Sequence, residues 1–287
     1  MAMAHIAFVG LGVMGWPMAR HLAAAGHDVR LFNRTAEKAV RFAAAYGGTA
    51  CATVAEAAEG ADALITCVGN DDDVRQVTEG AGGGFATLPD GALFIDHSTA
   101  SAALAKALAD RNPRLRCIDA PVSGGQAGAE SGQLAIMCGG DEQAVEAARP
   151  ILDCYGRRVV RIGSSGHGQL AKMANQIAIA GVVQGLAESL HFALKAGLDT
   201  NALLDAIGQG AAQSWQMDNR ARTMVEGRFD FGFAVDLMRK DLGLVLDEAR
   251  SNGASLPVAA LVDQFYADVQ KLGGNRNDTS SLIRRLA

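Results

Sequence analysis

The sequence has no excess of basic residues, and this absence limits the partners it can have. Its 26 lysines and arginines are outnumbered by 31 aspartates and glutamates, which gives a net charge of −5. Binding along a nucleic-acid backbone needs a cationic surface to neutralise phosphates. We therefore expect no nucleic-acid partner.

Segments typical of secretion and of membrane insertion are also missing. No basic stretch followed by an apolar stretch opens the chain, so we expect no signal peptide. No uninterrupted apolar run reaches the length needed to span a bilayer, so we expect no membrane partner. The expected location is cytoplasmic.

Cysteines and histidines are few and show no ligand spacing. The five cysteines are scattered and form no C-x-x-C pair, so we interpret them as buried, reduced thiols. The six histidines include no H-E-x-x-H motif. The sequence therefore predicts no metal site.

What is present is a chain of 287 residues, long enough for two domains, whose pattern changes near residue 163. Up to that point, short apolar runs alternate with alanine-rich segments of helical periodicity. This alternation predicts a doubly wound, mainly parallel α/β sheet over residues 1–163. The expected strands are Ile6–Val9, Val29–Phe32, Ala63–Val68, Ala92–Ile95, Arg116–Ile118, Leu134–Met137 and Val159–Ile162.

After residue 163 the strand patterns stop and the sequence becomes helical. A proline-free stretch from Gly168 to Ala196 would be about 40 Å long if fully helical. Its middle part, Ile177–Val183, is apolar on every side, so we expect it to be buried all round, between two domains or two subunits. The sequence thus predicts an all-α domain over residues 164–287, joined to the first by a long interdomain helix. Further helices are expected at Thr200–Gly208, Ala234–Ser251, Val258–Leu272 and Ser280–Leu286.

Three glycines form the motif G-x-G-x-x-G directly after the first expected strand. Gly10 allows a tight turn, Gly12 lets a pyrophosphate approach the backbone, and Gly15 allows close packing of helix on strand. The pyrophosphate would lie at the amino end of the following helix. The alternative is a glycine-rich turn without a ligand. The motif predicts a dinucleotide site made of Gly10, Leu11, Gly12, Val13, Met14 and Gly15.

The end of the second expected strand indicates which dinucleotide binds. NAD sites usually have Asp or Glu there, whereas this chain has Asn33, Arg34 and Thr35. A guanidinium can pair with a 2′-phosphate that a carboxylate would repel, Thr35 adds a hydroxyl, and Lys38 adds charge. We predict NADP as the favoured cofactor, with NAD also possible. The alternative is a solvated loop in which Thr35 is a helix N-cap.

Four segments together resemble the β-hydroxyacid dehydrogenases. They are GLGVMGWPM at the opening, DAPVSGG (Asp119–Gly125), GHGQLAKMANQ (Gly166–Gln176) and GFAVDLMRKDL (Gly232–Leu242). The resemblance covers essentially the whole chain. It implies a Rossmann-type domain, an all-α domain, and an NAD(P)-dependent oxidoreductase. The implied reaction interconverts a short β-hydroxyacid and its semialdehyde, of the 3-hydroxyisobutyrate or tartronate semialdehyde type.

The resemblance implies that Lys172 is the catalytic proton donor and acceptor. It lies near the start of the long helix, where a lysine that loses hydration gives up its proton more readily. Asn175 and Gln176 follow three and four residues later, hence on the same helix face. The resemblance implies amides there that hydrogen-bond the substrate or hold the lysine. The alternative is an interface lysine with two polar neighbours.

Substrate contacts are implied on the same basis. Ser123, Gly124 and Gly125 follow a strand end, where open α/β sheets bind ligands, and they are expected to hold a carboxylate. Thr99 matches a position that lines the substrate and nicotinamide pocket. Trp215 falls in an expected linker, as either a pocket or a core residue.

The resemblance also implies cofactor contacts in the helical domain and in a loop of the first domain. Phe233, Lys240 and Asp241 match positions that close the cleft from the helical domain, with Lys240 near the cofactor. Val68, Gly69 and Asn70 stand where many members have Leu-Pro, near the nicotinamide ribose, and three aspartates follow. We expect the backbone of this loop to contact the cofactor, in a pocket with an altered wall.

Two alternatives to this reaction stay open. The same apparatus could reduce short aldehydes or imines promiscuously, or the chain could be a non-catalytic NADP-binding protein. The second is disfavoured because such a chain is expected to lack the lysine. The expected partners are a small carboxylate substrate and further copies of the chain. We predict a homodimer or homotetramer because one small domain would not cover the long helix.

Overall fold

A computed structural model of the chain describes residues 3–286, and the chain divides into two compact units. The first runs to Lys172 and the second begins at Met173. The division falls within α8 (His167–Lys195), which therefore begins in one unit and ends in the other. The domain boundary expected after residue 163 stays a prediction.

The first unit contains one mixed sheet. Its strands are β1 His5–Val9, β2 Asp28–Phe32, β3 Thr49–Ala50, β4 Ala63–Thr66, β5 Leu93–Asp96, β6 Arg116–Asp119, β7 Val122–Ser123, β8 Leu134–Gly140 and β9 Gly156–Gly163. The order is β3-β2-β1-β4-β5-β6-β8-β7, with β9 paired to β8. Only the pairings of β8 with β6 and β7 are antiparallel among the described strands. Every strand expected from an apolar run is present. The strands β3 and β7 were not expected, because two residues carry no periodicity.

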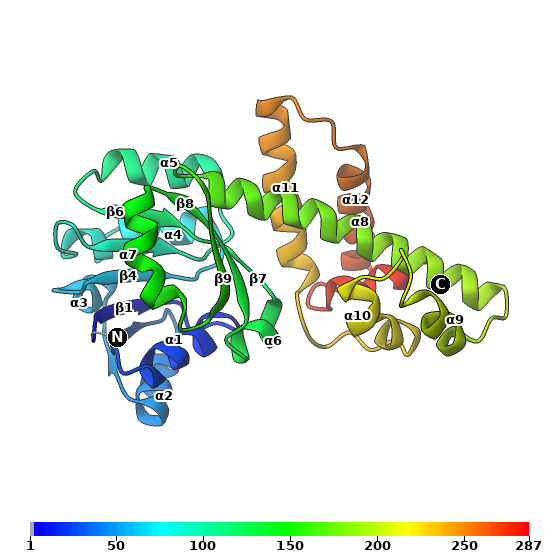
Figure 1. The fold of residues 1–287 in the computed structure, drawn as a ribbon, viewed down its shortest axis with the longest axis horizontal. Helices are drawn as coiled ribbons and strands as arrows, with labels where there is room; N and C mark the ends of the chain where they lie inside the picture. Colours follow the sequence, from blue (N-terminus) through cyan, green and yellow to red (C-terminus); the bar gives the residue numbers. More distant parts are fainter. Residues whose placement is uncertain (1–2, 287) are drawn as a thin grey trace. The chain divides into compact units, whose positions relative to one another are not determined.

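Helices cover both faces of this sheet (Figure 1). They are α1 Gly15–Ala24, α2 Ala36–Tyr46, α3 Val54–Ala58, α4 Asp71–Thr78, η1 Gly84–Ala86, α5 Ala102–Arg111, α6 Gly125–Glu130 and α7 Glu142–Leu152. In β1, Ile6 and Phe8 belong to the core formed with α1, α2, α6 and α7. Ala7 and Val9 belong to the core formed with α3, α4 and α5. The strands are apolar on both faces because both faces are buried.

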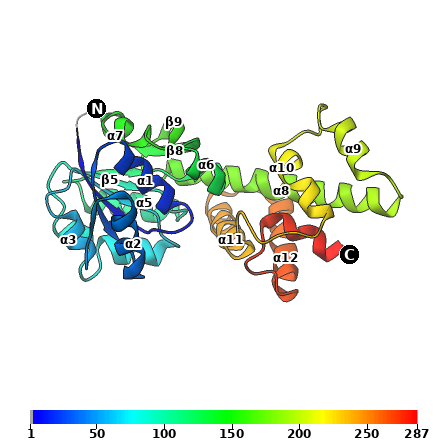
Figure 2. The same ribbon diagram turned by 90° about the horizontal axis from the view of Figure 1, so that it is seen from below.

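The second unit is mostly helical over its described residues. After α8 come α9 Thr200–Ile207, α10 Trp215–Val225, α11 Val235–Asn252, α12 Pro257–Lys271 and the 3₁₀ helix η2 Thr279–Leu286. One apolar core joins α8, α10, α11, α12 and η2. Figures 1 and 2 show α11 and α12 side by side.

Helix α10 replaces the linker that the sequence suggested. Its start is capped by Ser214, whose Oγ accepts a hydrogen bond from Met217 N at 3.1 Å. Trp215 is 52% exposed, and the Arg220 guanidinium lies 4.9 Å from its ring centre. Trp215 is therefore not a core residue.

The apolar middle of α8 is covered on one side only. Val183 is fully buried, whereas Val182 is 41% exposed. The expectation that Ile177–Val183 is buried all round is therefore wrong for the single chain. By length and composition alone α8 could cross a bilayer, with 39% of the apolar window buried. This is weak evidence for a membrane span, because the core helix of a soluble protein passes the same test.

Candidate active site

The glycine-rich turn after β1 has the form that a dinucleotide needs. Gly10 has a φ of +100°, and a Cβ there would lie 2.2 Å from the Cys67 carbonyl oxygen. A Cβ on Gly15 would lie 1.9 Å from the Gly10 carbonyl oxygen. A Cβ on Gly12 would meet nothing within 4 Å, and the adjacent Val13 is exposed. Packing therefore requires Gly10 and Gly15, while Gly12 leaves the amino end of α1 open to a pyrophosphate.

Asn33 ties this turn to the end of β2. Its Oδ1 accepts a hydrogen bond from Leu11 N at 2.8 Å, and its Nδ2 donates to Thr35 O at 3.0 Å. Arg34 next to it is 90% exposed. Thr35 occupies the N-cap position of α2, but its side chain makes no capping hydrogen bond. Asn33 thus shapes the backbone, and Arg34 and Thr35 present polar groups that can meet a ribose or its phosphate.

A basic hollow of about 520 Å³ borders the same turn. Its lining includes three cationic side chains and one acidic side chain, namely Arg20, Lys38, Arg41 and Glu130. In a chain with a net charge of −5, this local positive charge favours an anionic ligand. The hollow therefore supports the binding of a phosphorylated cofactor beside the turn.

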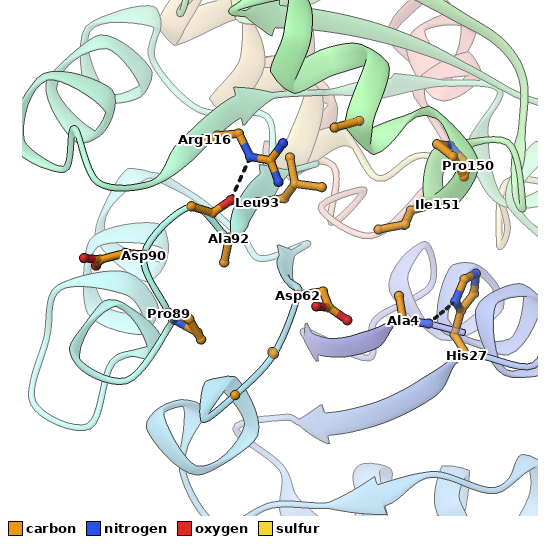
Figure 3. Close-up of a pocket in the computed structure, with 14 residues that line it drawn as sticks. Ala4, His27, Asp62, Pro89, Asp90, Ala92, Leu93, Arg116, Pro150 and Ile151 are labelled. Carbon is orange, nitrogen blue, oxygen red and sulfur yellow. Dashed lines mark hydrogen bonds between the residues drawn. The ribbon is translucent and has the colours of Figure 1, made fainter. Parts of the chain in front are cut away.

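Another hollow, of about 500 Å³, lies at the amino ends of the strands (Figure 3). Its polar groups include Asp62, His27 and Arg116, and Arg116 Nε donates to the Gly91 carbonyl oxygen at 2.7 Å. Open α/β sheets bind their ligands at the opposite, carboxyl ends of the strands. This hollow is therefore not part of the candidate site.

Lys172 is buried near the carboxyl end of β6, the strand that ends at Asp119. It is 8% exposed, and its Nζ donates a hydrogen bond to the Val122 carbonyl oxygen at 2.9 Å. Val122 and Ser123 form β7, and Gly124 and Gly125 follow with φ values of +132° and +60°. Residues with side chains rarely adopt these angles, so the turn depends on both glycines. The structure thus places Lys172 next to the predicted carboxylate-binding turn.

Asp119 fixes the start of the helix that carries Lys172. Its Oδ1 accepts from Gly166 N at 2.7 Å and its Oδ2 accepts from Gln169 N at 2.9 Å. A Cβ on Gly168 would lie 2.4 Å from the Asp119 carbonyl oxygen, so glycine lets α8 approach β6. Burial raises the pKa of Asp119 to about 7, although these hydrogen bonds act in the opposite direction. The sequence placed Asp119 in a motif but gave it no role.

Gln169 connects α8 to the loop that contains Thr99. It is fully buried, its Nε2 donates to the Ser98 carbonyl oxygen at 2.8 Å, and its Oε1 accepts from Ala100 N at 3.1 Å. The backbone on both sides of Thr99 is therefore held by one amide. Sequence reasoning missed Gln169 because these partners lie 71 and 69 residues away in the chain.

Two further polar residues are buried at the end of β5. Asp96 accepts from Ser98 N at 2.9 Å, and burial raises the pKa of Asp96 to about 6. His97 Nδ1 lies 2.6 Å from the Ala120 carbonyl oxygen and its Nε2 lies 2.8 Å from the Tyr155 hydroxyl oxygen. Since a carbonyl oxygen only accepts, Nδ1 carries the proton. Burial lowers the pKa of His97 to about 4, so its ring is neutral at pH 7.

The loop Val68–Asn70 connects β4 to α4. Val68 N donates to Ser98 Oγ at 2.9 Å, and Asn70 Oδ1 caps α4 by accepting from Asp73 N at 2.9 Å. Gly69 and Asn70 are exposed. The tip of the loop is therefore accessible to a ligand, and its contact with the cofactor stays a prediction.

In the second unit, Gln176 lies in a polar chain between α8 and α11. Asn175 Nδ2 donates to Gln176 Oε1 at 2.8 Å, and Gln176 Nε2 donates to Asp241 Oδ2 at 2.7 Å. The Nζ of Lys240 lies 2.9 Å from Asp241 Oδ1. Asp241 is 2% exposed, so the amide and the ammonium stabilise a charge that burial would otherwise penalise. Asp241 thus brings the predicted residues Asn175, Gln176 and Lys240 together.

Phe233 is placed by a different contact set. Its N donates to Asp278 Oδ2 at 2.9 Å and its carbonyl oxygen accepts from Thr279 N at 2.9 Å. Its half-buried side chain packs against the core of the second unit. The segment before η2 therefore positions Phe233.

Comparison with known proteins identifies the family. Residues 5–163 match the model described as the NAD binding domain of 6-phosphogluconate dehydrogenase. Residues 166–286 match the model described as NAD-binding of NADP-dependent 3-hydroxyisobutyrate dehydrogenase. Together the two models cover almost the whole chain.

Individual relatives agree with both matches. An uncharacterized oxidoreductase of Shewanella frigidimarina is 56% identical over 99% of this chain and 98% of its own length. The 2-hydroxy-3-oxopropionate reductase of Escherichia coli is 33% identical over 98% and 96%. The structure of Mycobacterium tuberculosis 3-hydroxyisobutyrate dehydrogenase with L-serine is similar with a TM-score of 0.89, at 34% identity over 99% of each chain. With its Rossmann-type sheet, all-α second unit and shared motifs, the chain belongs to the β-hydroxyacid dehydrogenase family and is an NAD(P)-dependent hydroxyacid dehydrogenase.

Proposed function

We propose that this dehydrogenase prefers NADP and interconverts a short β-hydroxyacid and its semialdehyde, of the 3-hydroxyisobutyrate or tartronate semialdehyde type. The observation that carries the proposal is the buried Lys172 next to the turn Ser123–Gly125. When bound, the nicotinamide supplies or accepts the hydride.

Lys172 acts as the proton donor in reduction and the proton acceptor in oxidation. Addition of hydride to a carbonyl carbon leaves negative charge on the oxygen, and a positioned ammonium stabilises that charge by giving a proton. The Val122 carbonyl oxygen at 2.9 Å orients the ammonium without neutralising it. Burial limits access of water to the same group.

The turn after β7 supplies the carboxylate site. The Ser123 hydroxyl and the N–H groups of Gly124 and Gly125 are donors that a carboxylate can accept from. A substrate that carries a carboxylate and a reactive oxygen on the β-carbon would use both this turn and Lys172. That pairing favours a β-hydroxyacid over an aldehyde without a carboxylate.

Gln176 has an orienting role in this proposal. Its amide is fixed by Asp241, so it has one preferred orientation within its own unit. It carries no proton that it could transfer at neutral pH. We therefore expect Gln176 and Asn175 to hold the substrate or the lysine rather than to perform acid–base chemistry.

The NADP preference is supported by the end of β2. Arg34 is exposed, and the Thr35 hydroxyl makes no capping hydrogen bond. The description of the family model that matches residues 166–286 names an NADP-dependent enzyme. A guanidinium with an adjacent hydroxyl suits a 2′-phosphate better than a 2′-hydroxyl.

We further propose a cytoplasmic homodimer or homotetramer, without a nucleic-acid or membrane partner. Exposed apolar side chains along α8 support self-association, with Val182 at 41% and Phe192 at 70% exposure. The net charge of −5 disfavours nucleic acid.

A substrate panel tests the proposal. Purified protein is mixed with NADPH and with short semialdehydes, with aldehydes of equal length that lack the carboxylate, and with cyclic imines, while nicotinamide absorbance is followed. We expect the semialdehydes to be reduced with the highest kcat/KM. Equal or better turnover of the uncharged aldehydes or imines would favour a promiscuous reductase, and nucleotide binding without any turnover would favour a non-catalytic protein.

A further inference from the structure

Arg34 has an acidic neighbour that the NADP preference does not explain. Its Nη1 lies 3.5 Å from Oδ1 of Asp73, on the first turn of α4. NADP sites place positive charge around the 2′-phosphate, and a carboxylate at this distance opposes it. Arg34, after β2, therefore favours a 2′-phosphate, and Asp73, at the start of α4, disfavours it.

The position of Asp73 is fixed by the loop that departs from the family pattern. Its Oδ2 accepts from Gly69 N at 3.2 Å, and its own N donates to Asn70 Oδ1 at 2.9 Å. A Cβ on Gly69 would lie 2.6 Å from Oδ2 of Asp73. Only glycine at position 69 leaves room for the Asp73 carboxylate to accept a hydrogen bond from the loop backbone. The other oxygen, Oδ1, faces Arg34.

The neighbouring aspartates do not share this arrangement. Asp71 accepts hydrogen bonds from Ser101 N at 2.8 Å and Ser101 Oγ at 2.6 Å. Asp72 is 94% exposed and pairs with Arg75 at 3.0 Å. Of the three consecutive aspartates, Asp73 is thus the one whose ion pair is with Arg34.

The ion pair is too loose to serve as a support for Arg34. Its separation of 3.5 Å exceeds that of a charge-assisted hydrogen bond, and the arginine side chain is 90% exposed. An exposed pair of this kind holds a long side chain weakly. We therefore expect the Asp73 carboxylate to act mainly by repelling a phosphate, and only weakly by restricting the Arg34 side chain.

We propose that Asp73 is a specificity-determining residue that opposes Arg34 at the 2′ position of the adenosine ribose. Arg34 favours the 2′-phosphate of NADP, and Asp73 repels that phosphate while tolerating, or accepting a hydrogen bond from, the 2′-hydroxyl of NAD. The chain then uses both cofactors, and Asp73 limits its preference for NADP. This inference rests on the proposed cofactor site at the end of β2.

Direct binding tests the inference without a substrate. Affinities of the parent protein and of Asp73→Asn are measured by calorimetry for NADP⁺, NAD⁺, adenosine 2′,5′-bisphosphate and AMP. Asparagine keeps an oxygen that can accept from Gly69 N, so the loop can stay in place. We expect the NADP⁺-to-NAD⁺ affinity ratio to rise about 3- to 10-fold, with most of the gain lost at 1 M salt. The bisphosphate-to-AMP ratio should rise in parallel.

Asp72→Asn is the matched control, because it removes the same charge from an adjacent residue that pairs with Arg75. Its affinity ratio should stay within about 2-fold of the parent value, since exposed charges farther from the ligand are screened. The same ratios of kcat/KM for NADPH and NADH provide a kinetic check.

The outcomes separate this inference from the proposed function. An unchanged ratio in Asp73→Asn would show that Asp73 only holds the loop, and a lower ratio would show that it positions Arg34; either result overturns the inference while leaving the cofactor site intact. A parent protein that binds neither dinucleotide would overturn the proposed function together with this inference.

Discussion

The ammonium of Lys172 is hydrogen-bonded to the main-chain carbonyl oxygen of Val122, at 2.9 Å. Val122 directly precedes the turn Ser123–Gly125, so the backbone that forms the expected carboxylate site also holds the expected acid. A carbonyl oxygen that accepts a hydrogen bond from an ammonium fixes the orientation of that ammonium. The arrangement suits a lysine that gives a proton to a substrate oxygen.

Lys172→Ala should lower kcat by about 10²- to 10⁴-fold, the usual contribution of a positioned acid. Nucleotide affinity should change little, because the proposed cofactor contacts are the turn Gly10–Gly15 and Arg34. Lys172→Arg should not restore turnover, since a guanidinium does not release its proton and has a wider head group. Steady-state kinetics and nucleotide titration check both statements, with the exposed Lys271→Ala as control. Retention of more than about a tenth of parental kcat would mean that another residue is the acid.

Arg34→Asp should reverse or abolish the preference for NADPH over NADH. A charge-assisted contact to a phosphate is worth on the order of 1.5–3 kcal/mol, or about 10- to 150-fold in kcat/KM. Arg157→Asp on the exposed strand β9 makes the same change in net charge and should leave the preference unchanged. Equal efficiency of the parent protein with the two cofactors would contradict the prediction.

Gln169→Ala should weaken substrate binding and lower stability together. The substitution leaves the Ser98 carbonyl and the Ala100 N–H without their amide partner, at a cost of about 1–3 kcal/mol for each buried group. The loop containing Thr99 would then be less well positioned, so KM for the substrate should rise. Gln184→Ala is a control on the same helix, because Gln184 is also buried and donates to Glu188. If both variants lose stability and neither changes KM, Gln169 has no positioning role.

His97 should make stability fall as the pH is lowered through the range between its two pKa values. Burial lowers the pKa of His97 from 6.5 to about 4, so in this range the unfolded chain binds a proton that the folded chain does not. The contribution of His97 to the free energy of unfolding is nearly constant above about pH 6.5. Acidification to pH 4 lowers this free energy by about 3 kcal/mol.

Urea denaturation of the parent and of His97→Asn between pH 4.5 and 7.5 measures this effect. Burial raises the pKa values of Asp96 and Asp119, so each adds to the free energy of unfolding a pH slope opposite in sign to that of His97. Both contributions are present in parent and variant, and they cancel in the difference. The parent-minus-variant free energy of unfolding should decrease as the pH falls. Parallel curves for the two proteins would show that His97 does not titrate differently on folding.

Self-association should depend on the exposed face of α8. Light scattering at micromolar concentration should give a dimer or a larger assembly, and Val182→Glu should shift it toward the monomer, because it places a charge on an apolar contact. The control Leu272→Glu places the same charge on an apolar side chain that is 50% exposed and lies outside α8, and it should leave the assembly unchanged. A monomeric parent protein would be inconsistent with the proposed oligomer.

The sequence by itself determined the elements whose pattern is local. Ile6–Val9 and the other long strands carry continuous apolar runs because both faces of the sheet are buried. The glycines at 10, 12 and 15 have different roles within a few residues of one turn, so their spacing identified the turn without further information. The family resemblance could assign a role to Lys172 because this lysine lies inside a contiguous motif on one helix, and that role stays a prediction.

Only the tertiary structure decided which side chains these elements bring together. Asp119 with Gly166, Gln169 with Ser98, and Arg34 with Asp73 are pairs separated by tens of residues, and each forms where two strand or helix ends meet. Periodicity reports which face of an element is buried, but it does not report which polar group lies opposite. The partner depends on strand order and on how far each strand extends, and these follow from the packing of the whole sheet.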